Sequence, residues 1–238
     1  MNLSRTAERA LTAYGGADRW REARAVEATV TVGGLLFRLK RRMPVPRARV
    51  RTEIWRPRAR IDPIGQSGAV GVLEAPDVRI ETPGGGETAA HRRDARAYFP
   101  YGRRWFAWDE LDLAYFLGYA FWNYFALPAL LLRDDVAWTE ASEGVLVPRF
   151  PAHLPTHGRD QRLLFDRETG LLRRYDYRPE VVVGALPLTV GNLVLEHAVS
   201  EGVPYPSRRR VTPIRRKDTR LLGRPVMVTI EVEDWRLL

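Results

Sequence analysis

Residues 105–132 read WFAWDELDLAYFLGYAFWNYFALPALLL, and this stretch decides how the rest of the chain is interpreted. From Leu113 to Leu132 it carries no charged side chain, over about the 20 residues that a helix needs to cross the hydrocarbon core of a bilayer. A helix that is apolar all round is either a membrane span or wholly buried in a protein. The stretch must therefore be hidden from water in one of these two environments.

The composition of this stretch favours a protein interior. Its polar side chains each need a hydrogen-bond partner that hydrocarbon cannot supply: Tyr115, Tyr119, Asn123 and Tyr124. Pro128 disfavours a helical conformation at Leu127, which predicts a helix from about Trp108 to Phe125, shorter than a comfortable span. Acidic side chains fall in its first turn, where negative charge stabilises a helix N-terminus: Asp109, Glu110 and Asp112.

Alternation of apolar and polar residues predicts β-strands on both sides of this helix. In residues 26–32, valine and alanine alternate with Glu27, Thr29 and Thr31. Proline and glycine separate the segments as in antiparallel hairpins, and His91–Arg96 is interpreted as a polar connector. Further strands are predicted at Leu35–Arg41, Arg47–Trp55, Ala69–Leu73, Val78–Thr82, Trp138, Val145–Phe150, Arg162–Phe165, Leu171–Tyr177, Leu186–His197, Ser207–Val211 and Val226–Trp235.

Two short helices are predicted to precede the strands. Ser4 is placed to cap the first, in which Ala7, Ala10, Leu11 and Tyr14 recur at helical spacing. A second helical turn covers Ala17 to Arg24. Because strands dominate both halves of the chain, we predict a single α+β domain over residues 1–238, with a strongly curved antiparallel sheet enclosing the N-terminal helix and the central aromatic helix.

Length and cysteine content narrow the class of protein. A chain of 238 residues can bury a sizeable core, and the absence of cysteine excludes disulfides and a thiolate nucleophile. The first residues, MNLSRTAERALTAYGG, carry charges where a secretion signal has its apolar region, and no lipid-attachment cysteine is present. We therefore expect a cytoplasmic protein.

The run Gly84–Gly86 follows Pro83 in a hairpin-like turn and does not resemble a phosphate-binding loop, so no cofactor is predicted.

The net charge of +9 raises the question of nucleic-acid binding. Only Lys40 and Lys217 are lysines, and no nucleic-acid-binding motif accompanies the arginines. The clusters Arg208–Arg210 and Arg215–Lys217 are interpreted as part of a solvated strand face, which argues against nucleic acid. A weak attraction to anionic membrane surfaces and an adaptor role towards acidic partners are the alternatives that the charge leaves open.

Several segments resemble a group of uncharacterised bacterial proteins that are similar in plan to the LolA-like lipoprotein-carrier superfamily. They are YGGADRW at Tyr14–Trp20, WDEL at Trp108–Leu111 running on to AYFLGYAFWNY at Ala114–Tyr124, GLLRRYDY at Gly170–Tyr177 and PSRRRV at Pro206–Val211. The resemblance implies an incomplete β-barrel whose concave face holds helices and, in the carriers, accepts acyl chains. The chain departs from the exported carriers because it lacks their signal peptide and lipidation cysteine.

The aromatic stretch is the candidate binding site. Large aromatics at helical spacing commonly form a core, but so many rings bearing hydroxyl or NH groups also suit an apolar cavity with a few polar tips. We predict non-covalent binding of a lipid or other apolar small molecule, with the oligomeric state left open. The predicted ligand-binding residues are Trp105, Trp108, Tyr115, Tyr119, Trp122, Asn123 and Tyr124.

The histidines supply a second hypothesis. His153 and His157 are four residues apart, but Pro151 and Pro155 argue against a helix there, so no metal site is predicted. An enzyme acting on a hydrophobic metabolite in the same cavity is the alternative function, and whether the protein is an enzyme stays open. Its acid/base candidates are His157, Asp176, Tyr177 and His197.

Overall fold

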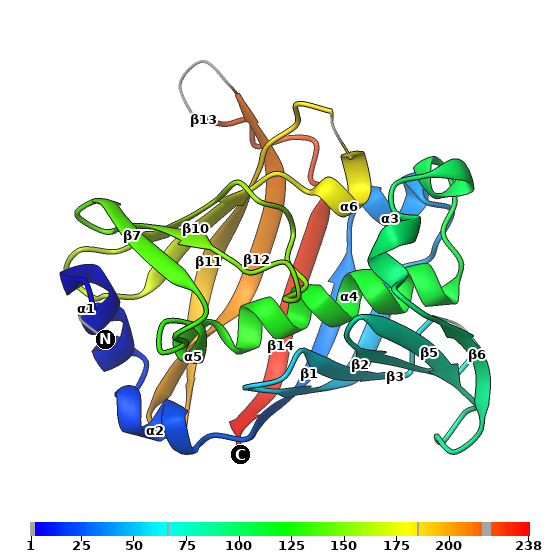
Figure 1. Ribbon diagram of the computed structural model, residues 1–238, viewed down its shortest axis with the longest axis horizontal. Helices are drawn as coiled ribbons and strands as arrows, with labels where there is room; N and C mark the ends of the chain where they lie inside the picture. Colours follow the sequence, from blue (N-terminus) through cyan, green and yellow to red (C-terminus); the bar gives the residue numbers. More distant parts are fainter. Residues whose placement is uncertain (1–2, 66, 185, 216–219) are drawn as a thin grey trace.

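An antiparallel sheet, curved but not closed, forms the body of the protein (Figure 1). The structure is a computed structural model that describes residues 3–65, 67–184, 186–215 and 220–238. Within these residues, fourteen strands join the sheet, and all paired strands run antiparallel. The predicted curved antiparallel sheet with helices is confirmed.

The chain builds this sheet in two halves. The first half pairs in sequence order and consists of β1 (Ala25–Gly33), β2 (Val45–Glu53), β3 (Arg58–Asp62), β4 (Val70–Glu74), β5 (Asp77–Glu81) and β6 (Thr88–Arg92). The second half consists of β7 (Ala137–Ser142), β8 (Val145–Arg149), β9 (Gln161–Phe165), β10 (Leu172–Tyr177), β11 (Val190–Ser200), β12 (Val203–Arg215), β13 (Arg220–Leu221) and β14 (Val228–Leu237). The C-terminal strand β14 lies between β1 and β12 and so joins the two halves, while β6 and β7 are the edges.

Cross-strand ion pairs cover the outer face of the sheet. Arg51 pairs with Glu27 of the adjacent strand, and Arg208 pairs with Glu196. Arg47 Nη1 lies 2.6 Å from Glu233 Oε2. Opposite charges facing each other across strands stabilise a sheet modestly. Many arginines that give the chain its positive charge are therefore already matched by neighbouring carboxylates.

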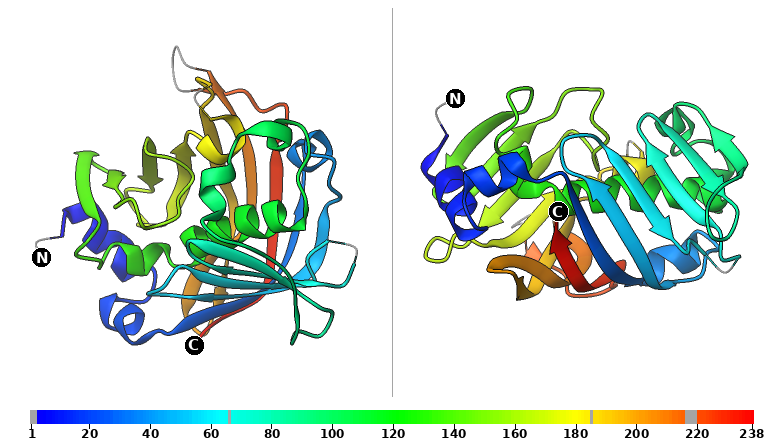
Figure 2. Two further views of the ribbon diagram at one scale, coloured as in Figure 1. Left: turned by 45° about the vertical axis from the view of Figure 1, so that its right-hand side comes forward. Right: turned by 90° about the horizontal axis from the view of Figure 1, so that it is seen from below.

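The helices lie at the ends and on the concave side of the sheet (Figures 1 and 2). The long helix α4 crosses the concave side, and 14 of its 16 residues are buried. Among the described residues, no helix combines the length and the apolar character needed to traverse a bilayer. The helices are α1 (Arg5–Ala13), α2 (Ala17–Glu22), α3 (Leu35–Leu39), α4 (Glu110–Phe125), α5 (Leu127–Leu130) and α6 (Glu180–Val183), with 3₁₀ turns η1 (Ala95–Tyr98) and η2 (Gly102–Trp105).

The start of α4 is fixed by carboxylates, as predicted. Asp109 and Asp112 form a capping box, in which each side chain accepts a hydrogen bond from the backbone N–H of the other. The carboxylate of Asp112 is fully buried, and three guanidinium groups converge on it. Their nearest nitrogens lie 2.5 to 2.9 Å from its oxygens and belong to Arg92, Arg103 and Arg104.

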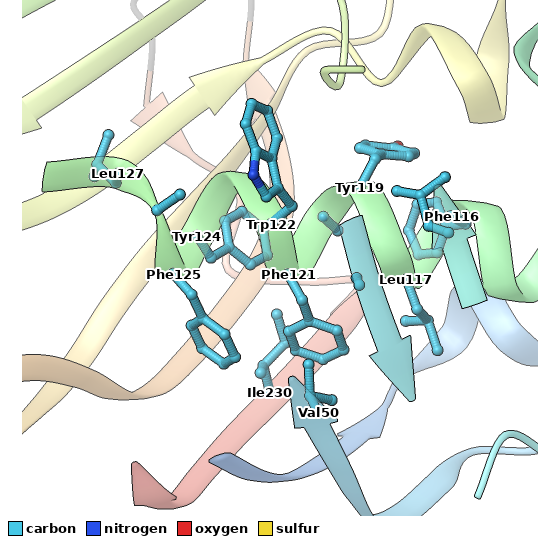
Figure 3. Packing of buried hydrophobic residues seen from close by; sticks show 14 of the residues in the cluster. Val50, Phe116, Leu117, Tyr119, Phe121, Trp122, Tyr124, Phe125, Leu127 and Ile230 are labelled. Carbon is cyan, nitrogen blue, oxygen red and sulfur yellow. The ribbon is translucent and has the colours of Figure 1, made fainter. Parts of the chain in front are cut away.

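Two glycines let α4 approach the sheet closely. A Cβ added to Gly118 would lie 2.7 Å from Leu73 Cβ, and one added to Gly71 of β4 would lie 2.9 Å from Ala114 Cβ. Further along, Phe121 and Phe125 point towards the strands that carry Val50 and Ile230, whereas Trp122 points away from them (Figure 3). The helix ends at Phe125, as the sequence predicts. Leu127, for which a non-helical conformation is predicted, instead begins the short α5, with Pro128 in its first turn.

The N-terminal helices lie at one end of the sheet. Ser4 caps α1 as predicted, by accepting a hydrogen bond from the Ala7 amide. Thr6 Oγ1 donates to Glu140 of β7 and accepts from the Gly144 amide, so α1 is fixed to the β7–β8 hairpin. After α1, the indole of the fully buried Trp20 donates to the Tyr14 carbonyl oxygen at 2.8 Å.

Further local differences between prediction and structure lie in the first half of the chain. Residues 35–39, predicted as a strand, form α3, because Gly34, at a φ of 117°, turns the chain where a Cβ would lie 2.4 Å from the Met227 carbonyl oxygen. Part of the predicted connector at 91–96 belongs to the edge strand β6. The strand β3 was not predicted, because only Ala59 and Ile61 mark its buried face between two prolines.

Candidate functional site

Two small hollows lie between α4 and the concave face of the sheet. The inner hollow has a volume of about 20 Å³, which is room for about one water molecule. Its lining comes from α4 and from strands of both halves of the sheet: Val32, Phe116, Leu117, Ala120, Phe121, Tyr124, Tyr177, Val211, Val228 and Ile230. Apart from two tyrosines, every lining side chain is apolar.

The outer hollow lies beside the inner one and is equally small, at about 20 Å³. Pro204, Tyr205 and Pro206 are only half-buried and form its rim. Tyr124 lines both hollows, so its side chain lies between them. The outer hollow is lined by Tyr14, Trp20, Tyr124, Phe125, Leu127, Pro128, Pro204, Tyr205, Pro206, Arg209 and Trp235.

A cluster of tyrosines surrounds a buried histidine next to the inner hollow. The His157 ring stacks on the Tyr177 ring, with centroids 3.8 Å apart and 9° between the planes. The Tyr124 and Tyr177 hydroxyls are 3.1 Å apart, and Tyr175 donates its hydroxyl proton to Gln161. Sequence reasoning missed Tyr175, although it alternates in phase with Tyr177 on β10.

Burial controls the ionisation of this cluster. Loss of solvation, together with the positive charges of Arg96 and Arg209, lowers the pKa of His157 to about 3. Loss of solvation also raises the pKa of Tyr124, Tyr175 and Tyr177. Neither ring nitrogen of His157 has a hydrogen-bond partner within the described parts of the chain. The imidazole is therefore neutral at physiological pH and poorly suited to general-base catalysis there.

Arg209 lies inside the protein, which corrects the prediction that Arg208–Arg210 belongs to a solvated face. Its neighbour Arg208 is exposed, whereas Arg209 is 4% exposed and holds its guanidinium carbon 4.7 Å from the centroid of the Tyr124 ring. Successive side chains of a strand point to opposite faces, and Arg209 is in phase with the buried Val211. The alternation of β12 therefore already contained the signal for an inward arginine.

Tyr14 brings a further hydroxyl to the outer hollow. Its oxygen accepts a hydrogen bond from the Leu172 amide at 3.1 Å and lies 3.4 Å from His197 Nε2. Burial and the nearby charge of Arg209 lower the pKa of His197 to about 4, so this imidazole is also neutral at physiological pH. Burial raises the pKa of Tyr14 to about 12.

The four acid/base candidates do not form one group. His157 and Tyr177 are in contact, but the Asp176 carboxylate is bonded to the Arg174 guanidinium, with 2.7 Å between Oδ2 and Nη2. Asp176 falls between Tyr175 and Tyr177 on β10, so its side chain points to the opposite face of the sheet. His197 contacts Tyr14 instead. The geometry that the enzyme hypothesis needs is not present among these four residues.

The predicted ligand-binding residues have different positions. Of the seven, only Tyr124 lines the two hollows. Trp105 is 37% exposed in η2, and Trp108 is buried below the ammonium group of Lys40. Asn123 donates to the carbonyl oxygens of Tyr119 and Pro155. The other three predicted residues are buried in the core: Tyr115, Tyr119 and Trp122. The indole nitrogen of Trp122 and the hydroxyl of Tyr119 have no hydrogen-bond partner among the described atoms.

Larger hollows have several charged residues in their lining. Two of them, of about 700 and 890 Å³, share Arg96, Arg159, Asp160 and Glu180. The larger of the two also has an apolar side, to which Val147, Phe150 and Leu154 contribute. In the part of the chain that the structure describes, no group of three histidine or acidic side chains is arranged to hold a metal ion. His153 is exposed and pairs with Asp135, away from the buried His157.

Comparison with known proteins identifies the fold. A LolA superfamily protein from Nitrosomonas europaea superposes with a TM-score of 0.51 at 9% identity, over 100% of this chain and 94% of that one. A DUF1329 family protein from Desulfovibrio piger gives a TM-score of 0.48 at 12% identity, over 98% of this chain and 91% of that one. No protein-family model and no curated protein matches the sequence. The first superposition, which extends over nearly the whole of both chains, confirms the predicted LolA-like fold.

Proposed function

We propose that this protein binds a lipid or another apolar small molecule non-covalently, between α4 and the concave face of the sheet. The observation that carries the proposal is the position of Tyr124, which separates two hollows on the concave side of a LolA-like sheet. The carriers of the LolA-like superfamily accept acyl chains on this face. In the proposal, the sheet encloses the ligand with the help of α4 and of Tyr14 at the end of α1.

The ligand enlarges the space that it occupies. Each hollow has room for about one water molecule, so a lipid chain fits only when the Tyr124 and Phe121 side chains move. Burial of the chain provides the driving force, at about 25 cal/mol per Å² of apolar surface removed from water. Binding then shifts the population from the conformation in which side chains fill the interior to one in which they have moved aside. The ligand stabilises the second conformation because it binds it more tightly.

Polar groups at the tyrosine cluster help to orient the ligand. Tyr124 and Tyr177 both line the inner hollow, and His157, stacked on Tyr177, has ring nitrogens without a partner in the described chain. Apolar binding sites commonly combine such a lining with a small number of polar groups. The tyrosines can exchange their mutual hydrogen bond for one to a ligand.

Native mass spectrometry of the freshly purified protein tests this function. We expect peaks heavier than the polypeptide that disappear after delipidation and return on addition of palmitate, hexadecanol or farnesol. The same compounds should raise the melting temperature of the delipidated protein in proportion to their occupancy. Bare polypeptide in every spectrum, together with an unchanged melting temperature for all three compounds, would contradict the proposal.

A matched pair of variants locates the binding. Ala120→Leu adds volume directly in the inner hollow, whereas Leu195→Phe adds volume at an exposed position of β11. We expect Ala120→Leu to reduce binding of hexadecanol at least about tenfold and Leu195→Phe to leave it unchanged. Melting curves of both variants show whether each is folded. Equal binding by two folded variants would place the ligand elsewhere.

A further inference from the structure

Arg209 is a buried cation that lacks a carboxylate partner among the described residues. Its side chain is 4% exposed, and its Nη1 atom has no hydrogen-bond partner. The other buried charged side chains each bond to a group of opposite polarity: Lys40 to two carbonyl oxygens, Glu81 to Arg60 and Arg79, Asp112 to three arginines, and Asp176 to Arg174. Arg209 therefore differs from them in a way that requires a physical account.

The environment of Arg209 offsets the burial of its charge only in part. An arginine keeps its proton in proteins, so it cannot avoid the cost of desolvation by becoming neutral. The Tyr124 ring below the guanidinium attracts a cation, but it carries no formal negative charge to balance that of the arginine. Loss of solvation, the largest cause, lowers the pKa of Arg209. The site is thus short of one negative charge.

The groups around Arg209 are suited to a small anion. Tyr14 lines the same outer hollow and carries a hydroxyl, and His197 Nε2 lies 3.4 Å from that hydroxyl oxygen. A planar guanidinium matches a carboxylate with two parallel hydrogen bonds. A carboxylate is smaller than a phosphate and therefore requires less enlargement of the outer hollow, which has room for about one water molecule. The half-buried Pro204 and Pro206 place this site close to the surface, nearer than the inner hollow.

We propose that the ligand is a single-chain amphiphile with a carboxylate head group, which pairs with Arg209 in the outer hollow while its chain extends past Tyr124 into the inner hollow under α4. This inference rests on the proposed apolar binding and adds the chemical class of the ligand. It gives Arg209 the counter-ion that the described chain does not supply. It also orients the ligand, with its charged end at the Pro204–Pro206 rim.

The test compares three probes of equal chain length: palmitate, hexadecanol and hexadecyl phosphate. Dissociation constants are measured at neutral pH with the delipidated full-length protein, below the micelle concentration of each probe. The wild type should bind palmitate at least about tenfold more tightly than hexadecanol, because a charge-assisted bidentate contact is stronger than a neutral hydrogen bond. Palmitate should also exceed hexadecyl phosphate.

Arg209→Met removes the cation and keeps a side chain of similar length. This variant should lose the preference for palmitate over hexadecanol while it still binds hexadecanol. Arg208→Met is the matched control, because Arg208 is the exposed neighbour and pairs with Glu196. It should keep the wild-type preference. If Arg209→Met does not fold, Arg209→Gln replaces it, since its amide retains hydrogen bonding without charge.

The outcomes separate the two proposals. Failure of the wild type to bind any of the three probes would overturn the proposed function together with this inference. Wild-type protein that binds hexadecanol and palmitate equally would overturn the inference alone. A preference for palmitate that persists in Arg209→Met would place the head group elsewhere, and a preference for hexadecyl phosphate would replace the carboxylate by a phosphate.

Discussion

The imidazole of His157 lies parallel to the phenol ring of Tyr177, with their centroids 3.8 Å apart. The histidine comes from the loop between β8 and β9, and the tyrosine ends β10, so this contact holds the loop against the sheet. Burial and two nearby arginines keep the imidazole neutral. The pair therefore couples the stability of the fold to pH.

The first prediction concerns this coupling. The pKa of His157 is lowered to about 3 in the folded protein, from a value near 6.5 in the unfolded chain. Between these values the unfolded chain binds the additional proton, so the free energy of unfolding falls as the pH decreases below about 6.5. The loss due to this group is about 2 kcal/mol between pH 7 and pH 5.

His157→Phe keeps an aromatic ring against Tyr177 and removes the titrating group. Denaturant unfolding of wild type and variant at pH 7 and pH 5 measures the difference. The variant should lose less stability than the wild type over this interval, and the remaining loss reports other groups such as His197. Equal losses in the two proteins would show that His157 is not held neutral by burial.

A second prediction concerns the buried carboxylate at the start of α4. Asp112→Ala leaves Arg92, Arg103 and Arg104 without their shared acceptor and removes half of the capping box. We expect a loss of about 3–5 kcal/mol in the free energy of unfolding, as found when one partner of a buried ion pair is removed. Glu110→Ala in the same turn is the control, because Glu110 has only a 3.9 Å approach to Arg42 and an exposed hydrogen bond from the Ser67 hydroxyl, and it should cost less than about 1 kcal/mol.

A third prediction concerns the close approach of α4 to β4. Gly118→Ala places a Cβ 2.7 Å from Leu73 Cβ and should destabilise the protein by about 1–3 kcal/mol, although alanine is the better helix former. A double-mutant cycle with Leu73→Ala checks the cause. The two substitutions should together cost less than the sum of their separate effects. Strict additivity would contradict a clash between these two side chains.

A fourth prediction concerns the inner hollow. Phe121→Ala should lower the free energy of unfolding by about 3–5 kcal/mol, because it opens a cavity in a packed core. Under the proposed function, the same cavity admits a chain more readily, so hexadecanol should raise the melting temperature of Phe121→Ala more than that of the wild type. Leu195→Ala, at an exposed position, should change neither quantity.

The elements with a strong local pattern could be predicted from the sequence. Alternation identified β1, β2 and β14, and Pro128 together with the acids at 109–112 located both ends of α4. The prediction of a strand at residues 35–39 was wrong, because the turn at Gly34 depends on the backbone of Met227, which is distant in the sequence. Local patterns cannot report such contacts.

The candidate site was predictable only in part. The absence of charge along the stretch identified α4 as buried but could not show which of its faces meets the hollows, since nearly all of the helix is buried. Tyr124 was therefore found together with Tyr115, Tyr119 and Trp122, which lie elsewhere in the core. The inward direction of Arg209 follows from the alternation of β12, but its contact with Tyr124 depends on how the sheet curves around α4.

Photo-crosslinking with a palmitate that carries a diazirine near the end of its chain tests the central claim most directly. After irradiation and proteolysis, mass spectrometry locates the labelled residues. The account predicts labels on α4 between 116 and 125 and on the facing residues of β12 and β14, suppressed by excess unlabelled palmitate. Labels confined to exposed aromatics such as Phe106, and not suppressed by palmitate, would contradict it.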